Sequence, residues 1–278
     1  MQQNTATEKT RDSNQLWEHY VIERELADRL RCATAKERTT LYNMVYEERN
    51  RRIPHHPLVV RANDRQAQIR AAVPQLRLLR AFVNSETVFL EVGAGDAALA
   101  TELAKHVGKV YVTDVTTTLI GDIEWPVNAE FRITNGISVP VPPASIDLVY
   151  SNQVMEHLHP EDAHEQLQNI YGVLRPGGQY ICITPNRLSG PHDISAHFDE
   201  VATGFHLKEY TIVELARVLN KAGFSRVNVF LSYKGHILSP ILPILPFTLV
   251  EWAIARLPRA VRRKVGYLLV AAKMIATK

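Results

Sequence analysis

The stretch Val88-Phe-Leu-Glu-Val-Gly-Ala-Gly-Asp-Ala-Ala-Leu-Ala100 decides the fold of this 278-residue chain. Its first five residues form a short run of mostly apolar β-formers, which predicts a buried strand. Gly93 and Gly95 follow at once, and a helix is expected to begin after Asp96. A strand, a glycine turn and a helix in this order bring backbone N–H groups close to a nucleotide-like ligand.

The composition is that of a globular protein with one α/β domain and an accessory segment. Hydrophobic residues make up 46% of the chain and charged residues 22%, and the net charge is +3. This charge is too small to indicate a nucleic-acid partner. Of the two cysteines, Cys182 lies in an apolar run typical of a core, so no disulfide framework is implied. The polar N-terminus lacks the apolar segment of a secretory signal, and we expect a cytoplasmic protein.

Residues 1–82 predict a helical cap on a domain that occupies residues 83–278. Apolar residues at four-residue spacing indicate helix between about residues 16 and 50, and a second helical pattern covers residues 64–82. Between them, Ile53-Pro-His-His-Pro57 is an irregular break. Its two histidines are either exposed loop residues or part of a substrate pocket.

Strands and helices alternate after the glycine turn. Apolar runs predict strands at residues 109–114, 129–134, 146–150, 179–184 and 226–233, with a last strand near 267–277. Thr211 and Glu214 form a capping box for one of the intervening helices, and Arg175-Pro-Gly-Gly178 ends another. This alternation predicts a mostly parallel sheet with helices on both faces. Asp114 ends the second strand about 20 residues after the glycines, where a carboxylate can accept hydrogen bonds from ribose hydroxyls.

Taken in order, these motifs resemble the class I S-adenosylmethionine-dependent methyltransferases, in particular the group that includes the quinone-biosynthesis enzymes. The resemblance covers about residues 88–235. It rests on Glu91-x-Gly93-x-Gly95, Asp114, Ile146-Asp-Leu-Val149, Met155-Glu-His157, Leu174-Arg-Pro-Gly-Gly178 and Ala222-Gly-Phe224. It implies a doubly wound, seven-stranded sheet of order 3-2-1-4-5-7-6 with the last strand antiparallel. It also implies S-adenosylmethionine as the cofactor.

The resemblance assigns cofactor contacts residue by residue. We expect Glu91, Gly93 and Gly95 around the methionine moiety, and Asp114 and Val115 at the ribose and adenine. Asn135 and Gly136 are expected beside the adenine, and Ser151, Asn152 and Gln153 beside the sulfonium. Members of the family often carry an acid where this chain has Asn135. An amide can still accept the hydrogen bond of the adenine amino group, so only the detail of binding is affected.

Transfer of a methyl group to a hydroxyl calls for a base, and histidine is the natural residue for it. His157 follows the fourth strand at the sheet edge where ligands of such folds bind, and it is either a base or a structural residue. In the polar loop 185–207, His192 and His206 are further candidates for contact with the acceptor. Their spacing fits no zinc pattern, so no metal is expected. The polar loop favours O-methylation of a polar small molecule or glycan, lipid-linked acceptors included.

Other functions stay open at this point. Within the family, quinone or lipid acceptors and transfer to nitrogen or carbon remain compatible with the residues. A NAD-dependent oxidoreductase shares the glycine pattern, but the chain has no Tyr-x-x-x-Lys pair, and Arg175-Pro-Gly-Gly178 has no role there. A third class is a cofactor-binding partner subunit without catalysis. Methyl transfer to an acceptor would show an enzyme, whereas cofactor binding without transfer would favour such a partner subunit.

Residues 236–264 form an apolar insert before the last strand. Three prolines, at positions 240, 243 and 246, and the charged Glu251 interrupt the apolar run, so a membrane-spanning helix is not expected. The insert forms either a lid over the acceptor pocket beside the N-terminal helices or a peripheral membrane contact through residues 237–264. The second interpretation follows from the basic cluster after the apolar run, an arrangement that binds anionic lipid surfaces. The sequence does not indicate an oligomeric state.

Overall fold

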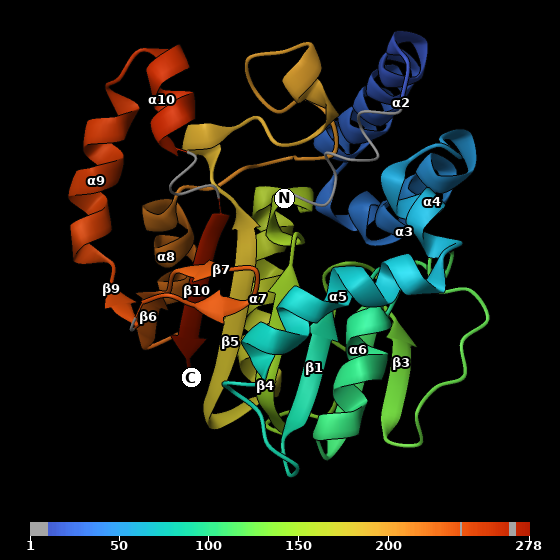
Figure 1. The fold of residues 1–278 in the computed structure, drawn as a ribbon, viewed down its shortest axis with the longest axis vertical. Coiled ribbons are helices and arrows are strands. Elements are labelled where there is room, and N and C mark those ends of the chain that lie inside the picture. Colours follow the sequence, from blue (N-terminus) through green and yellow to red (C-terminus); the bar gives the residue numbers. More distant parts are fainter. Residues whose placement is uncertain (1–10, 240, 267–270) are drawn as a thin grey trace.

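The computed structural model describes residues 11–239, 241–266 and 271–278, and an eight-stranded sheet forms its centre (Figure 1). The strand order is β3-β2-β1-β4-β5-β10-β6-β9. The strands are β1 (Val88–Val92), β2 (Lys109–Asp114), β3 (Ala129–Ile133), β4 (Ile146–Asn152), β5 (Leu174–Pro185), β6 (Arg226–Val229), β9 (Leu242–Pro243) and β10 (Ala271–Thr277). Strands β1 to β5 are parallel, and β10 is antiparallel to both its neighbours. The predicted order is confirmed, with β9 added at the edge of β6 as an eighth strand.

Helices cover both faces of the sheet, each with its own hydrophobic core. Helices α5 (Arg65–Leu79) and α6 (Ala98–Leu103) pack on one face, and α7 (Pro160–Val173) and α8 (Ile212–Lys221) pack on the other. The capping box predicted at Thr211 is present at the start of α8. Cys182 lies buried in the core beneath α7 and α8, as predicted.

The N-terminal residues form two long helices instead of one continuous stretch. Helix α2 (Ser13–Cys32) ends at Ala33, and α3 (Ala35–Arg52) begins with a capping box in which Thr34 bonds Glu37. The short helix α4 (Pro57–Ala62) follows the predicted break, with proline at its first position. Figure 1 shows α2, α3 and α4 together above the end of the sheet at which β1 and β3 terminate.

Two strand predictions need correction. The block Arg175-Pro-Gly-Gly178 does not separate a helix from a strand, because α7 already ends at Val173 and β5 begins at Leu174, which pairs with Ile146. The predicted strand 226–233 divides after β6. Its last residues form β7 (Ser232–Tyr233), which pairs with β8 (His236–Ile237) in a separate hairpin. The first residues of the predicted last strand, 267–270, lie outside the described residues.

The insert before the last strand packs beside α8, on the opposite side of the molecule from α2 and α3 (Figure 1). It contains α9 (Leu245–Ala255) and α10 (Arg259–Gly266). Its single acid, Glu251, points inward and accepts backbone N–H groups of Ile212 (2.7 Å) and Val213 (3.0 Å) at the start of α8. None of the insert's described residues lines the cavity at the carboxyl ends of β1, β2 and β4, so the structure does not favour the insert as a lid over this cavity. No helix among the described residues is both long and apolar enough to cross a membrane.

A buried charge network fixes α3 to the start of α7. The Arg38 guanidinium donates from Nε to Oδ2 of Asp162 (2.6 Å) and from Nη2 to Oδ1 (2.9 Å). The Tyr42 hydroxyl donates to the same carboxylate (2.7 Å) and accepts the backbone N–H of His159 (2.9 Å). Both charged side chains are 2% exposed, so each depends on the other for compensation. Arg38 also reaches Glu161, whose side chain is 70% exposed.

We expect Asp162→Ala to lower the free energy of unfolding by about 3–5 kcal/mol, because it leaves the buried Arg38 charge without its main partner. Denaturant unfolding followed by circular dichroism measures this change. Glu161→Ala is the matched control, since it removes only an exposed partner of the same guanidinium and should stay within about 0.5 kcal/mol of the wild type. Equal effects of the two substitutions would contradict the assigned role of Asp162.

Candidate functional site

A cavity of about 140 Å³ lies at the carboxyl ends of β1, β2 and β4. This is the point at which the strand order reverses, and ligands of open α/β sheets bind at such points. Six of the predicted cofactor residues line it: Gly93, Gly95, Asp114, Val115, Gly136 and Gln153. The sequence pattern around the glycine turn thus identified the floor of the cavity.

The glycine turn after β1 has a shape that a side chain would not allow. Gly93 has φ +72°, and a Cβ there would lie 2.4 Å from Cγ2 of Val154. The N–H of Gly95 donates to Oδ2 of Asp114 (2.8 Å), and that of Thr116 donates to Oδ1 (3.2 Å). Asp114 therefore holds the turn against the end of β2. Burial raises the pKa of Asp114, and these backbone N–H groups oppose the rise.

Glu91 is buried beneath the turn without lining the cavity. Its Oε2 has no hydrogen-bond partner among the described residues. Burial, followed by the charges of Asp96 and Asp114, raises its pKa well above the ordinary value. Its position is that of an acid held within the fold below the glycine turn.

Three further predicted cofactor residues lie beside the cavity with their side chains engaged elsewhere. Asn135 accepts the backbone N–H groups of Ile137 (3.0 Å) and Ser138 (2.8 Å) through one oxygen, so its amide closes its own turn. The Ser151 hydroxyl bonds that of Tyr180 (2.6 Å). Asn152 donates to a side chain of α5 (3.2 Å). Asn135 does not line the cavity at the adenine position expected from the family. Its neighbour Thr134 does.

The roof of the cavity comes from α3, within the predicted helical cap, although none of its residues was among the predicted site residues. Tyr42, Tyr46 and Arg49 line the cavity from this helix. Their spacing of four and three residues places them on one helix face and is the signal that could have identified them. Tyr42 packs so closely on Gly136 that a Cβ there would lie 3.1 Å from its ring. Asn43 of the same helix donates to the carbonyl of Val115.

Arg49, one of the roof residues, packs against two aromatic rings. Its guanidinium carbon lies 5.0 Å from the centre of the Tyr46 ring and 5.7 Å from that of Phe205, and the two rings stack. Arg49 is 4% exposed and bonds Asn50. Among the described residues it makes no ion pair, so a buried cation faces the cavity.

His157 lines the cavity, and His206 lies next to it. The centres of their rings are 5.0 Å apart. His157 Nδ1 lies 3.0 Å from the carbonyl of Phe205, and His206 Nδ1 lies 2.8 Å from Oε1 of Glu209. Burial and the charge of His206 lower the pKa of His157 to about 3. Burial alone would lower that of His206, but Glu209 and other carboxylates raise it to about 9.

His192 lies behind this pair. Its Nε2 is 2.9 Å from the Ser189 hydroxyl and 3.1 Å from the carbonyl of Asn186. Its backbone N–H donates to the same Glu209 oxygen that His206 contacts (2.7 Å). His192 does not line the cavity, so among the three predicted histidines only His157 reaches it directly.

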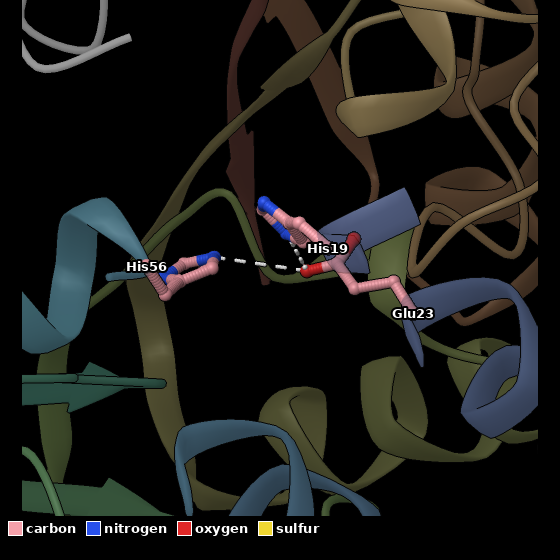
Figure 2. A group of neighbouring side chains, drawn as sticks. All are labelled: His19, Glu23 and His56. Atoms are coloured by element: carbon pink, nitrogen blue, oxygen red, sulfur yellow. Dashed lines mark ion pairs between the residues drawn. The ribbon is translucent and has the colours of Figure 1, made fainter. Parts of the chain in front are cut away.

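A second group of buried titratable residues joins α2 to the start of α4. Figure 2 shows the Glu23 carboxylate between the rings of His19 and His56. Glu23 Oε1 lies 2.9 Å from Nε2 of His19 and 3.6 Å from Nε2 of His56. Burial lowers the pKa of His56 to about 3, and the charge of Arg49 adds to the effect. The predicted break before α4 therefore contributes a buried histidine, and His55 beside it is partly buried.

Comparison with known proteins finds methyltransferases that match part of the chain. Residues 90–182 match the family of methyltransferase domains. A probable S-adenosylmethionine-dependent methyltransferase of Mycolicibacterium smegmatis is 32% identical over 137 residues, covering 49% of this chain and 51% of the relative. One from Mycobacterium tuberculosis is 31% identical over 137 residues, covering 49% and 47%. The chain thus spans about half the length of these curated relatives.

Solved structures share the fold. A putative methyltransferase of Haloferax volcanii, solved in complex with the Trm112 activator, superposes with a TM-score of 0.55 over 80% of this chain and 97% of its own, at 15% identity. Phosphoethanolamine N-methyltransferase 1 of Haemonchus contortus gives a TM-score of 0.54 over 88% and 50%, at 16% identity. These two likenesses concern the fold alone. The match over residues 90–182 and the curated relatives indicate a methyltransferase domain of the kind that uses S-adenosylmethionine in that part of the chain.

Proposed function

We propose that the protein transfers the methyl group of S-adenosylmethionine to a hydroxyl of a polar acceptor, such as a small molecule or a glycan. The observation that carries this proposal is the buried polar wall next to the cavity, where His157 lies against His206 and both lie close to Glu156. Such a wall offers hydrogen-bond partners to an acceptor hydroxyl.

The residues of the cavity fit the cofactor. The turn at Gly93 places no side chain in the cavity, and Asp114 is a carboxylate suited to ribose hydroxyls. We assign the adenine to the space among Val115, Gly136 and Tyr42. Arg49, which makes no ion pair within the described part of the chain, is available to the carboxylate of the methionine moiety. The helices within residues 1–82 then act as a cap, because α3 supplies the roof.

When bound, S-adenosylmethionine supplies a methyl group on a positively charged sulfur. The chain's own residues align the acceptor and keep water out, which is much of what an in-line displacement requires. We place the acceptor hydroxyl against the cavity face of His157, with His206 and Glu209 holding the loop behind it. His192 acts as a positioning residue through the same Glu209 oxygen.

Transfer to nitrogen is the alternative acceptor chemistry. The likeness to a phosphoethanolamine N-methyltransferase concerns the fold alone, at 16% identity. Buried carboxylates near His206 would also attract an amine. The hydroxyl is favoured because the buried cation Arg49 lines the same cavity and would repel an ammonium group.

Cofactor binding is predicted to depend on the glycine turn. Asp114→Ala and Gly93→Arg should abolish measurable S-adenosylmethionine binding in calorimetry, because the first removes the ribose acceptor and the second fills the turn. Glu86→Ala serves as the control, since Glu86 is exposed and precedes β1 at the opposite end of the sheet. Wild-type affinity in both site variants would refute the assignment of this cavity to the cofactor.

Catalysis is predicted to depend on His157. His157→Ala should bind S-adenosylmethionine like the wild type but transfer at least about 100-fold less labelled methyl to an extracted glycan and small-molecule pool. His106→Ala is the control, because His106 lies in the 3-10 helix that follows α6 and does not line the cavity. Transfer at the wild-type rate by the His157 variant would remove this residue from the mechanism. A protein that binds the cofactor but labels no acceptor would instead be a non-catalytic partner subunit.

We also propose that the outer face of α9 and α10 contacts an anionic membrane. With Glu251 turned inward, Leu245, Leu249 and Trp252 are 76%, 71% and 58% exposed. Arg256 lies over the Trp252 ring (3.6 Å), and further basic residues follow in α10: Arg259, Arg262, Arg263 and Lys264. An exposed apolar face beside a basic cluster is the pattern of an interfacial helix. Such a contact suits a lipid-linked acceptor.

The double variant Leu249→Ser and Trp252→Ser should lose most of its sedimentation with anionic phospholipid vesicles, because it removes the apolar half of the surface. Wild-type binding should also fall as salt rises, since its other half is electrostatic. Val127→Ser is the control, because it changes an exposed apolar residue far from α9 in sequence. If the wild type does not sediment with these vesicles at low salt, the contact does not exist.

A further inference from the structure

We propose that Glu156, His157 and His206 form a binding site for one divalent transition-metal ion on the wall of the cavity. One potential ligand atom from each residue lies within 4.8 Å of the other two. Two imidazoles and one carboxylate form a ligand set that such ions accept, and it leaves coordination positions for an outer ligand. The individual interactions of the three side chains make this set distinct from an ordinary polar cluster.

Both histidines have the hydrogen-bond partner that prepares an imidazole for a metal. The Phe205 carbonyl and the Glu209 carboxylate can only accept hydrogen bonds, so Nδ1 of His157 and Nδ1 of His206 must donate to them. In the neutral ring the lone pair is then on Nε2. Because the carboxylates around His206 raise its pKa to about 9, a metal ion must displace the proton that this Nε2 holds near neutral pH. An Nδ1–H bonded to a carbonyl or a carboxylate is the usual outer partner of a metal-binding histidine.

Glu156 contributes an oxygen that lacks a partner. Its side chain is fully buried, and its Oε2 accepts the Thr184 hydroxyl (2.9 Å). The other oxygen, Oε1, has no hydrogen-bond partner among the described residues. A buried oxygen left without a partner costs stability, and a bound cation would remove that cost.

The group of His19, Glu23 and His56 has the same composition and similar spacing, but its protons are placed differently (Figure 2). His56 Nδ1 accepts the backbone N–H of Leu58 (3.1 Å), and His19 Nδ1 faces the Arg11 guanidinium (2.6 Å). Arginine and a backbone N–H can only donate, so the ring protons lie on the Nε2 atoms, which are the ring nitrogens nearest to Glu23. Neither imidazole therefore has a lone pair on the side of the glutamate to offer a metal.

The site has a consequence for catalysis that rests on the proposed function. Because His157 lines the cavity, an acceptor hydroxyl in the cavity can approach an ion held by this residue. A divalent ion bound to a hydroxyl oxygen makes that hydroxyl more acidic and fixes its orientation. Metal binding itself needs neither the acceptor nor the methyl donor, so it can be tested separately.

The test is a titration of the metal-depleted full chain with Co²⁺, followed by calorimetry and by the visible absorption of the bound ion. We expect one ion per chain and a visible spectrum that indicates nitrogen ligands. Glu156→Gln and His206→Ala should each weaken binding at least about tenfold. The matched controls are His19→Ala and His56→Ala, which remove buried histidines from the other group of two histidines and one glutamate. Both variants should bind Co²⁺ as the wild type does.

Circular dichroism of each variant shows that it is folded before it is titrated. The proposal is overturned if the folded wild type binds no Co²⁺, or if binding is lost in His19→Ala and kept in Glu156→Gln. Full methyl transfer by protein kept in a chelator would end the catalytic consequence and leave the proposed function intact. Stoichiometric Co²⁺ binding without transfer to any hydroxyl acceptor would support the metal site and count against the proposed function instead.

Discussion

The buried ion pair between Arg38 and Asp162 is the interaction on which the geometry of the site depends. It fixes α3 to the beginning of α7, and Tyr42 joins the same carboxylate from one turn further along the helix. The face of α3 that follows carries Tyr46 and Arg49 into the cavity. A buried ion pair of this kind is not a large net source of stability, because desolvation offsets much of the attraction. Its value here is positional, since neither charge can be satisfied if the helix shifts along its axis.

The core of the fold could be predicted because its signals are local. The strand, the glycine turn and Asp114 lie within 30 residues of one another along the chain, and each has a backbone requirement that restricts the residue type. The errors arose where pairing between distant segments decides the outcome. The two-residue strand β9 exists only because the insert returns to the edge of β6, and Leu174 joins β5 because Ile146 lies opposite it. No local pattern carries that information.

The site was only partly predictable for a related reason. The resemblance to the methyltransferases covers the sheet and its loops, so it located the floor of the cavity. The roof belongs to residues outside the resembling region, and the face of α3 reads as an ordinary amphipathic pattern until its partner is known. Asn135 shows the opposite difficulty. Its position matches the family motif, yet the turn that it closes uses its amide oxygen.

The two groups of two histidines and one glutamate show how far residue composition falls short of chemistry. All members of both groups are buried except His157, which is partly exposed, and both groups bring their ligand atoms within the same distance. What separates them is the partner of each Nδ1 atom. In one group that partner is a donor, which places the ring proton on the nitrogen that faces the glutamate. In the other the partner is an acceptor, which places the proton on Nδ1 and leaves the lone pair of the neutral ring on Nε2. The second arrangement is built by the carbonyl of Phe205 and by Glu209, both on the loop that precedes α8. The chemistry of the wall is therefore determined by a loop whose own side chains mostly do not reach the cavity.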